Sequence, residues 1–203
     1  MNQIDYFGNG STDFFIGTDG GNYSKPSHDR LKNLIERDSS FYKLMQQLVT
    51  GKDVVEIGSG RDPLRCLFRF EPKSYVCVEP SDSRATDLPD FAKYEKTDGI
   101  TYLKDVSDSS VSIVSSYLFD RGMMSPKYES ELIKLISEKT IPEELSFHIL
   151  RHGVNGLFLP SGFNHIFLES LEKSDEIFER IISKHGTPSY DVYWTAAVFE
   201  KLD

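Results

Sequence analysis

Hydrophobic residues between Ser27 and Thr50 recur at three- and four-residue steps, and polar residues fill most of the positions between them. This spacing is typical of an amphipathic helix that buries one face. It predicts a helix that starts with Ser27 as its N-cap and breaks near 38–40. The buried face would consist of Leu31, Leu34, Ile35, Phe41, Leu44, Met45, Leu48 and Val49.

Short apolar runs then alternate with helical patterns. Strands are predicted near 54–57, 75–78, 94–96, 111–114 and 145–150, and helices after Pro63, within 83–93 and over 128–136. Asp62 followed by Pro63 is typical of a helix start. A helix is also expected near 177–182, and a final strand at 192–199 that runs antiparallel at or near an edge. This order predicts an α/β fold with a doubly wound, mostly parallel sheet and helices on both faces.

Residues 1–24 have a different composition, rich in Gly, Asn, Ser and Thr with aromatic residues between them. Glycines at this spacing resist regular structure. We expect either a flexible arm or a lid that closes over a site, because aromatic side chains in a solvated arm would waste apolar surface. No repeat or linker divides residues 25–203, which predicts a single domain there.

The chain has 203 residues and a net charge of −9. An acidic surface repels phosphate backbones and therefore disfavours nucleic-acid partners. No apolar run approaches the ~20 residues that span a bilayer, so no membrane segment is expected. Cys66 and Cys77 are the only cysteines, and the start of the sequence lacks the pattern of a secretory signal. We therefore expect reduced thiols and a cytoplasmic protein.

Three successive predicted strands end in residues suited to binding a nucleoside. The first ends in Gly58-Ser59-Gly60, the second in Glu79-Pro80 and the third in Asp98-Gly99. In open α/β sheets, ligands bind at the carboxyl ends of the strands, where a carboxylate can accept hydrogen bonds from a ribose diol. Each feature also has a structural explanation, namely a tight turn, a helix cap and a turn pair.

Acidic residues around the glycines indicate the charge of the ligand. Glu56 precedes Gly58 by two residues, and Asp62 precedes Pro63, which stands where a dinucleotide site has its third glycine. An anionic side chain at this helix start would repel a pyrophosphate. A ligand with a cationic end is therefore favoured over one with two phosphates.

The segment 54–60 resembles the first motif of the class I S-adenosylmethionine-dependent methyltransferases, which have a Rossmann-like fold. Residues 76–81 resemble the second motif, and 97–99 with 108–116 resemble the third motif and the fourth strand. The resemblance implies S-adenosyl-L-methionine as cofactor, with the amino-acid end near the glycines, the ribose at the second strand and the adenine at the third. The cofactor-binding residues it implies are Glu56 (near the ammonium), Gly58, Ser59, Gly60, Glu79, Pro80, Asp98, Gly99 and Ser115.

The methyl acceptor is less well defined. Family members often carry a glycine where Asp62 stands, and the Asn/Asp-Pro-Pro-Tyr/Phe signature for methylating amide or ring amino groups is absent. We expect a small-molecule or protein acceptor, with Tyr117 and His152 as candidate catalytic residues that orient or deprotonate it. No metal site is predicted, because His148 and His152 lack a third donor at a ligand spacing.

Two other functions remain open on this sequence. The departure at Asp62 is compatible with a catalytically silent relative of the fold that serves as a binding module. A nicotinamide-dependent oxidoreductase is disfavoured by Glu56, Asp62 and the missing glycine. The oligomeric state is not predicted.

Overall fold

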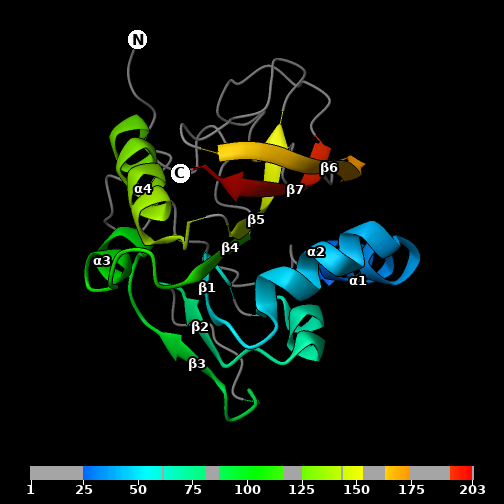
Figure 1. Cartoon of the computed structure of the whole chain (residues 1–203), viewed down its shortest axis with the longest axis horizontal. Coiled ribbons are helices and arrows are strands. Elements are labelled where there is room, and N and C mark those ends of the chain that lie inside the picture. The colour runs from blue at the N-terminus through cyan, green and yellow to red at the C-terminus, as the bar shows by residue number, and fades with distance from the viewer. Residues whose placement is uncertain are drawn as a thin grey trace, which may run out of the picture.

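The computed structural model describes residues 25–60, 62–80, 87–116, 125–142, 144–152, 163–173 and 193–202. Within them, strands form a seven-stranded sheet in the order β3-β2-β1-β4-β5-β7-β6 (Figure 1). Its members are β1 (Asp53–Ile57), β2 (Ser74–Val78), β3 (Ala92–Glu95), β4 (Ser112–Ser116), β5 (Leu145–His152), β6 (Phe163–Lys173) and β7 (Tyr193–Lys201). The arm at 1–24 and the helix expected near 177–182 lie outside the described residues.

The first five strands pair in parallel, and β7 runs antiparallel between β5 and β6. The predicted doubly wound, mostly parallel sheet with an antiparallel C-terminal strand is therefore confirmed. The strand order reverses between β1 and β4. These two strands pair in parallel with each other, so they end on the same side of the sheet. In such sheets the ligand crevice opens at this reversal, beyond the carboxyl ends of the strands.

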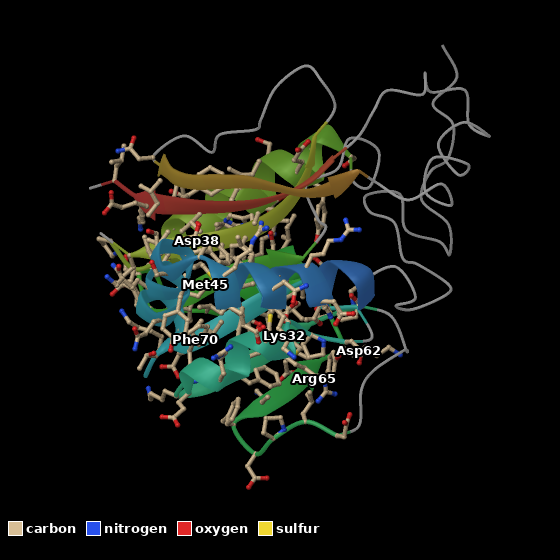
Figure 2. All side chains as sticks on the ribbon, turned by 90° about the vertical axis from the view of Figure 1, so that its right-hand side faces the viewer. Lys32, Asp38, Met45, Asp62, Arg65 and Phe70 are labelled. Carbon is tan, nitrogen blue, oxygen red and sulfur yellow. The ribbon has the colours of Figure 1, made fainter. Side chains whose placement is uncertain are left out.

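Helices cover both faces of the sheet (Figure 1). One face carries α1 (Lys25–Arg37), α2 (Ser39–Val49) and the short 3-10 helix η2 (Arg65–Phe70). Met45 and Phe70, labelled in Figure 2, belong to the apolar cluster on this face. The other face carries α3 (Gly99–Lys104) and α4 (Pro126–Lys139), which pack on a second cluster. Because helices bury both faces of the sheet, the central strands appear in the sequence as nearly continuous apolar runs.

The predicted break in the first helical segment is confirmed at Asp38. This residue caps α2, because its Oδ1 accepts hydrogen bonds from the backbone N–H groups of Ser40 and Phe41, at 2.8 and 3.0 Å. Ser27 does not start the segment, since α1 begins at Lys25. None of the helices in the described residues is long and apolar enough to cross a bilayer.

Two predictions in the middle of the chain were wrong. Asp62 does not cap a helix: only the six-residue η2 forms, it begins at Arg65, and no side chain caps it. The helix within 83–93 is absent from the described part of that range, since 87–91 are not helical and β3 occupies 92–95, while 83–86 lie outside the described residues. Pro89 restricts the residue before it, which disfavours helix there.

Candidate functional site

The chain turns sharply after β1, at a segment that we call the glycine turn (Gly58–Gly60). Gly58 and Gly60 have φ angles of 73° and 58°, in the left-handed region that side chains other than glycine rarely adopt. Gly58 N–H donates to the Val78 carbonyl at 2.9 Å, which fastens the turn to the end of β2. A Cβ atom placed on Gly60 would meet nothing within 4 Å. The turn therefore leaves room for a close approach at Gly60.

Glu79 and the glycine turn lie together, as the sequence predicts. The Gly60 N–H donates to Glu79 Oε2 at 2.9 Å, and the Tyr94 hydroxyl donates to the Gly60 carbonyl at 3.3 Å. Glu79 is 9% exposed and Pro80, next in the chain, is half-buried. The peptide groups of Gly60 are thus held over the ends of β2 and β3, the strands where the ribose and the adenine are expected.

Ser59, inside the glycine turn, carries a buried polar atom without a partner. The residue is 2% exposed, and its Oγ accepts and donates no hydrogen bond. Buried hydroxyls are normally satisfied by a hydrogen bond, so an unsatisfied one at a turn with open space beside it suits a site that binds a polar ligand. The unpaired Ser59 hydroxyl and the open space at Gly60 are therefore compatible with a turn that binds a nucleoside derivative.

Glu56 lies inside the protein, fully buried. Its Oε2 accepts hydrogen bonds from Leu64 N–H at 3.0 Å and from the Tyr75 hydroxyl at 2.8 Å. Burial, and then the Glu56 charge, raise the pKa of Tyr75 well above its usual value, so the phenol stays a donor. Glu56 therefore links the segment after the glycine turn to β2. These hydrogen bonds favour a role in positioning that segment over direct contact with an ammonium.

The two cysteines lie close to the same carboxylate. Burial, and then the Glu56 charge, raise the pKa of the Cys66 thiol to about 12, and the same two causes raise the pKa of the Cys77 thiol. A thiol with a raised pKa carries little of the reactive thiolate at neutral pH. Both cysteines are free, in agreement with the reduced thiols expected from the sequence.

Asp98 caps α3 instead of leaving its carboxylate open. Its Oδ1 accepts from the N–H groups of Ile100 and Thr101 and from the Tyr128 hydroxyl, at 3.0, 3.1 and 2.9 Å. Burial raises the pKa of this carboxyl, but the hydrogen bonds from Thr101, Tyr128 and Ile100 outweigh it and hold the pKa below its usual range. Oδ2 accepts from the Thr101 hydroxyl. Asp98 thus fixes the start of α3 and joins it to α4.

Gly99 owes its identity to packing. A Cβ atom there would lie 2.6 Å from Ile57 Cγ2 and 3.2 Å from Leu132 Cδ1. Ile57 is β-branched and buried in its strand, so this methyl cannot move away cheaply. Close approach of α3 to the end of β1 therefore requires glycine at this position.

We expect Gly99→Ala to lower the free energy of unfolding by about 1–3 kcal/mol, the usual cost of overpacking. Urea titration measures this loss. Combining it with Ile57→Ala, which removes Cγ2, should recover part of the cost in a double-mutant cycle, whereas Ile57→Val, which keeps Cγ2, should recover little. Equal coupling with both would mean that the Gly99–Ile57 contact is not the cause.

Ser115 belongs to a buried polar chain between β4 and β5. Its Oγ is hydrogen-bonded to His148 Nδ1 at 2.7 Å, and His148 Nε2 to Ser146 Oγ at 3.0 Å. His148 is 2% exposed, and burial lowers the pKa of its imidazole to about 3. The imidazole is therefore neutral at physiological pH, and Ser115 stabilises the end of β4.

Of the two candidate catalytic residues, the structure describes only the backbone of His152. Tyr117 lies outside the described residues, and the backbone of His152 ends β5. In the described part of the chain, no group of three His, Cys, Asp or Glu side chains could hold a metal ion. Sequence reasoning missed Tyr75, Tyr94 and Tyr128, whose hydroxyls reach the site residues from other elements.

No family model and no curated relative matches the sequence. Solved structures match the fold. A SAM-dependent methyltransferase from Archaeoglobus fulgidus aligns with a TM-score of 0.56 and 15% identity, over 88% of this chain and 97% of that one. The N-methyltransferase NodS from Bradyrhizobium japonicum gives 0.56 and 12%, over 89% and 99%. The cyclase SpnF gives 0.57 and 14%, over 94% and 86%. The fold is thus that of the class I S-adenosylmethionine-dependent methyltransferases, as the sequence motifs indicated.

Proposed function

We propose that this protein is an S-adenosyl-L-methionine-dependent methyltransferase that acts on a small-molecule or protein acceptor. The observation that carries the proposal is the contact between Gly60 and Glu79, which gathers an open glycine turn and a buried carboxylate at the carboxyl ends of β1 and β2. Adenosine-bearing ligands bind at this position in open α/β sheets. The fold shared with SAM-dependent methyltransferases supports the same ligand.

The residues of the turn would hold the cofactor as follows. Glu79 would accept hydrogen bonds from the ribose hydroxyls, and Pro80 would shape the same segment. Gly58 and Gly60 would leave space for the part of the cofactor that leads from the ribose to its sulfur. The Ser59 hydroxyl, which has no hydrogen-bond partner, would pair with the ligand. Asp98 and Gly99 would border the adenine through the start of α3, and Ser115 would support the end of β4 beside the acceptor.

The chemistry asks little of the protein. When bound, the cofactor's sulfonium supplies an electrophilic methyl group for in-line displacement by the acceptor. The protein needs to align the acceptor, and alignment alone can supply roughly 7–11 kcal/mol in well-oriented systems. Tyr117 and His152 remain the proposed residues for orienting the acceptor or removing its proton. A base matters only where the nucleophile carries a proton at neutral pH.

Calorimetry separates this function from its alternatives. We expect binding heat with S-adenosylmethionine and with S-adenosylhomocysteine, its demethylated product, and none with reduced nicotinamide cofactors. Heat with nicotinamide cofactors alone would support an oxidoreductase. If the protein binds S-adenosylmethionine but transfers its methyl group to no acceptor of a broad panel, a silent binding module is supported. The acidic Asp62 shortly after the glycine turn is compatible with that alternative. An absence of heat with all of them would contradict the proposal.

A further inference from the structure

The amino-acid end of the cofactor carries a carboxylate and an ammonium, and each needs a partner. The expected partner of the ammonium, Glu56, is fully buried and accepts from Leu64 N–H and the Tyr75 hydroxyl. A long helix after the glycine turn would offer the carboxylate its N-terminal N–H groups, but only the six-residue η2 is present. The inference below rests on the proposed function and identifies other partners.

His28 has a nitrogen that is buried and unused. It lies in the first turns of α1, and its Nε2 is inaccessible to solvent and has no hydrogen-bond partner. Such an atom in a folded protein calls for an explanation, because buried ring nitrogens are normally paired.

His28 lies near the segment that follows the glycine turn. Helix α1 packs on η2, where Glu36 and Arg69 approach to 3.8 Å. Figure 2 shows Asp62 and Arg65 beside α1, with Lys32 labelled on that helix. Asp62 lies two residues after Gly60, on the segment that leads from the turn to η2.

Asp62 supplies a charge beside the imidazole. Burial lowers the pKa of His28, while the negative charges of Asp62 and then Asp29 raise it and Arg65 lowers it. Arg65 is already paired, since its guanidinium donates to Asp87 Oδ1 at 2.7 Å. A carboxylate arriving next to His28 would favour the imidazolium further, and an ammonium would be attracted to Asp62.

We infer that His28 and Asp62 form the subsite for the zwitterionic amino-acid end of the cofactor, with His28 binding the carboxylate and Asp62 the ammonium. An acid and an imidazole at this place suit a ligand that carries both charges. They also give a role to the acidic side chain that follows the glycine turn at position 62. Neither residue contacts the sulfur or the methyl group in this assignment, so both act through binding.

The assignment has a consequence for pH. The free protein holds His28 neutral near pH 7, because burial lowers its pKa. A bound carboxylate raises that pKa, so binding takes up a proton and affinity rises as the pH falls from 8 to 6. The opposite sign, with affinity rising toward high pH, would not come from this imidazole.

The test measures affinity by calorimetry with three probes. S-Adenosylhomocysteine carries both charges, decarboxylated S-adenosylmethionine lacks the carboxylate, and 5′-methylthioadenosine lacks both. His28→Gln should weaken S-adenosylhomocysteine about tenfold, remove its dependence on pH between 6 and 8, and leave the other two probes unchanged. Asp62→Asn should weaken the first two probes and leave methylthioadenosine unchanged. Lys32→Gln, an exposed change on the same helix, is the matched control and should alter none.

Each outcome of this test either supports or overturns the His28–Asp62 subsite. Methylthioadenosine binding reports that a variant is folded with its nucleoside site intact, so a loss confined to the charged probes supports the subsite. A His28→Gln protein that binds S-adenosylhomocysteine as tightly as the wild type, or that loses all three probes equally, overturns it. A wild-type protein that binds none of the probes contradicts the proposed function itself, which distinguishes the two failures.

Discussion

Glu79→Ala is expected to weaken binding of S-adenosylhomocysteine by at least about 100-fold. A carboxylate that accepts two ribose hydroxyls loses two charge-assisted hydrogen bonds on truncation, and each contributes roughly 1.5–3 kcal/mol. The change also frees Gly60 N–H, which now donates to Glu79 Oε2 at 2.9 Å. Calorimetry of the purified variant measures the loss.

Two further variants show whether the lost affinity comes from the carboxylate. Glu79→Gln keeps an oxygen for Gly60 but loses the charge, so an intermediate loss of about tenfold is expected. Asp90→Ala removes an exposed carboxylate between β2 and β3 and should leave affinity unchanged. Full affinity in Glu79→Ala would mean that the ribose does not lie at the end of β2.

Acid is expected to destabilise the protein through His148. Its pKa is about 3 in the folded protein, because burial disfavours the imidazolium, against about 6.5 in an unfolded chain. The stability that the neutral imidazole contributes is therefore fully present above pH 6.5. It is lost as the pH falls toward 3, by about 2 kcal/mol between pH 6 and 4.5. Urea titrations at several pH values measure the slope.

His148→Gln isolates this contribution. The variant keeps hydrogen-bonding groups between Ser115 and Ser146 but cannot take up a proton, so its stability should fall less steeply in the same range. Carboxylates with lowered pKa values, such as Asp53 and Asp98, contribute acid sensitivity that remains in both proteins. Identical slopes in wild type and variant, or an imidazole that titrates near pH 6.5 by NMR, would contradict the assignment.

The sheet could be predicted where the pattern was simple. The inner parallel strands β1, β2 and β4 carry short apolar runs with buried side chains, and β7 is buried over 196–199. β6 was missed, because register shifts at His165/Phe167 and Ser170/Glu172 break its two-residue alternation. The helix expected after Asp62 and Pro63 forms only as the six-residue η2, which begins at Arg65.

The candidate site could be predicted from residues that end strands, because parallel strands bring their carboxyl ends to one edge. Gly60 and Glu79 meet there as expected. The sequence contains no pattern that brings Tyr75, Tyr94 or Tyr128 to the site, because each arrives from another element through tertiary packing. The interior position of Glu56 was missed for the same reason, since its partners come from other segments.

A crystal structure of the protein with S-adenosylhomocysteine tests the central claim most directly. The account predicts the ribose hydroxyls within hydrogen-bond distance of Glu79 and the sulfur beyond the glycine turn, with the adenine beside the start of α3. Density for the nucleoside at any other part of the surface, with Gly60 still bound to Glu79 and the space beside it filled by protein, would contradict it.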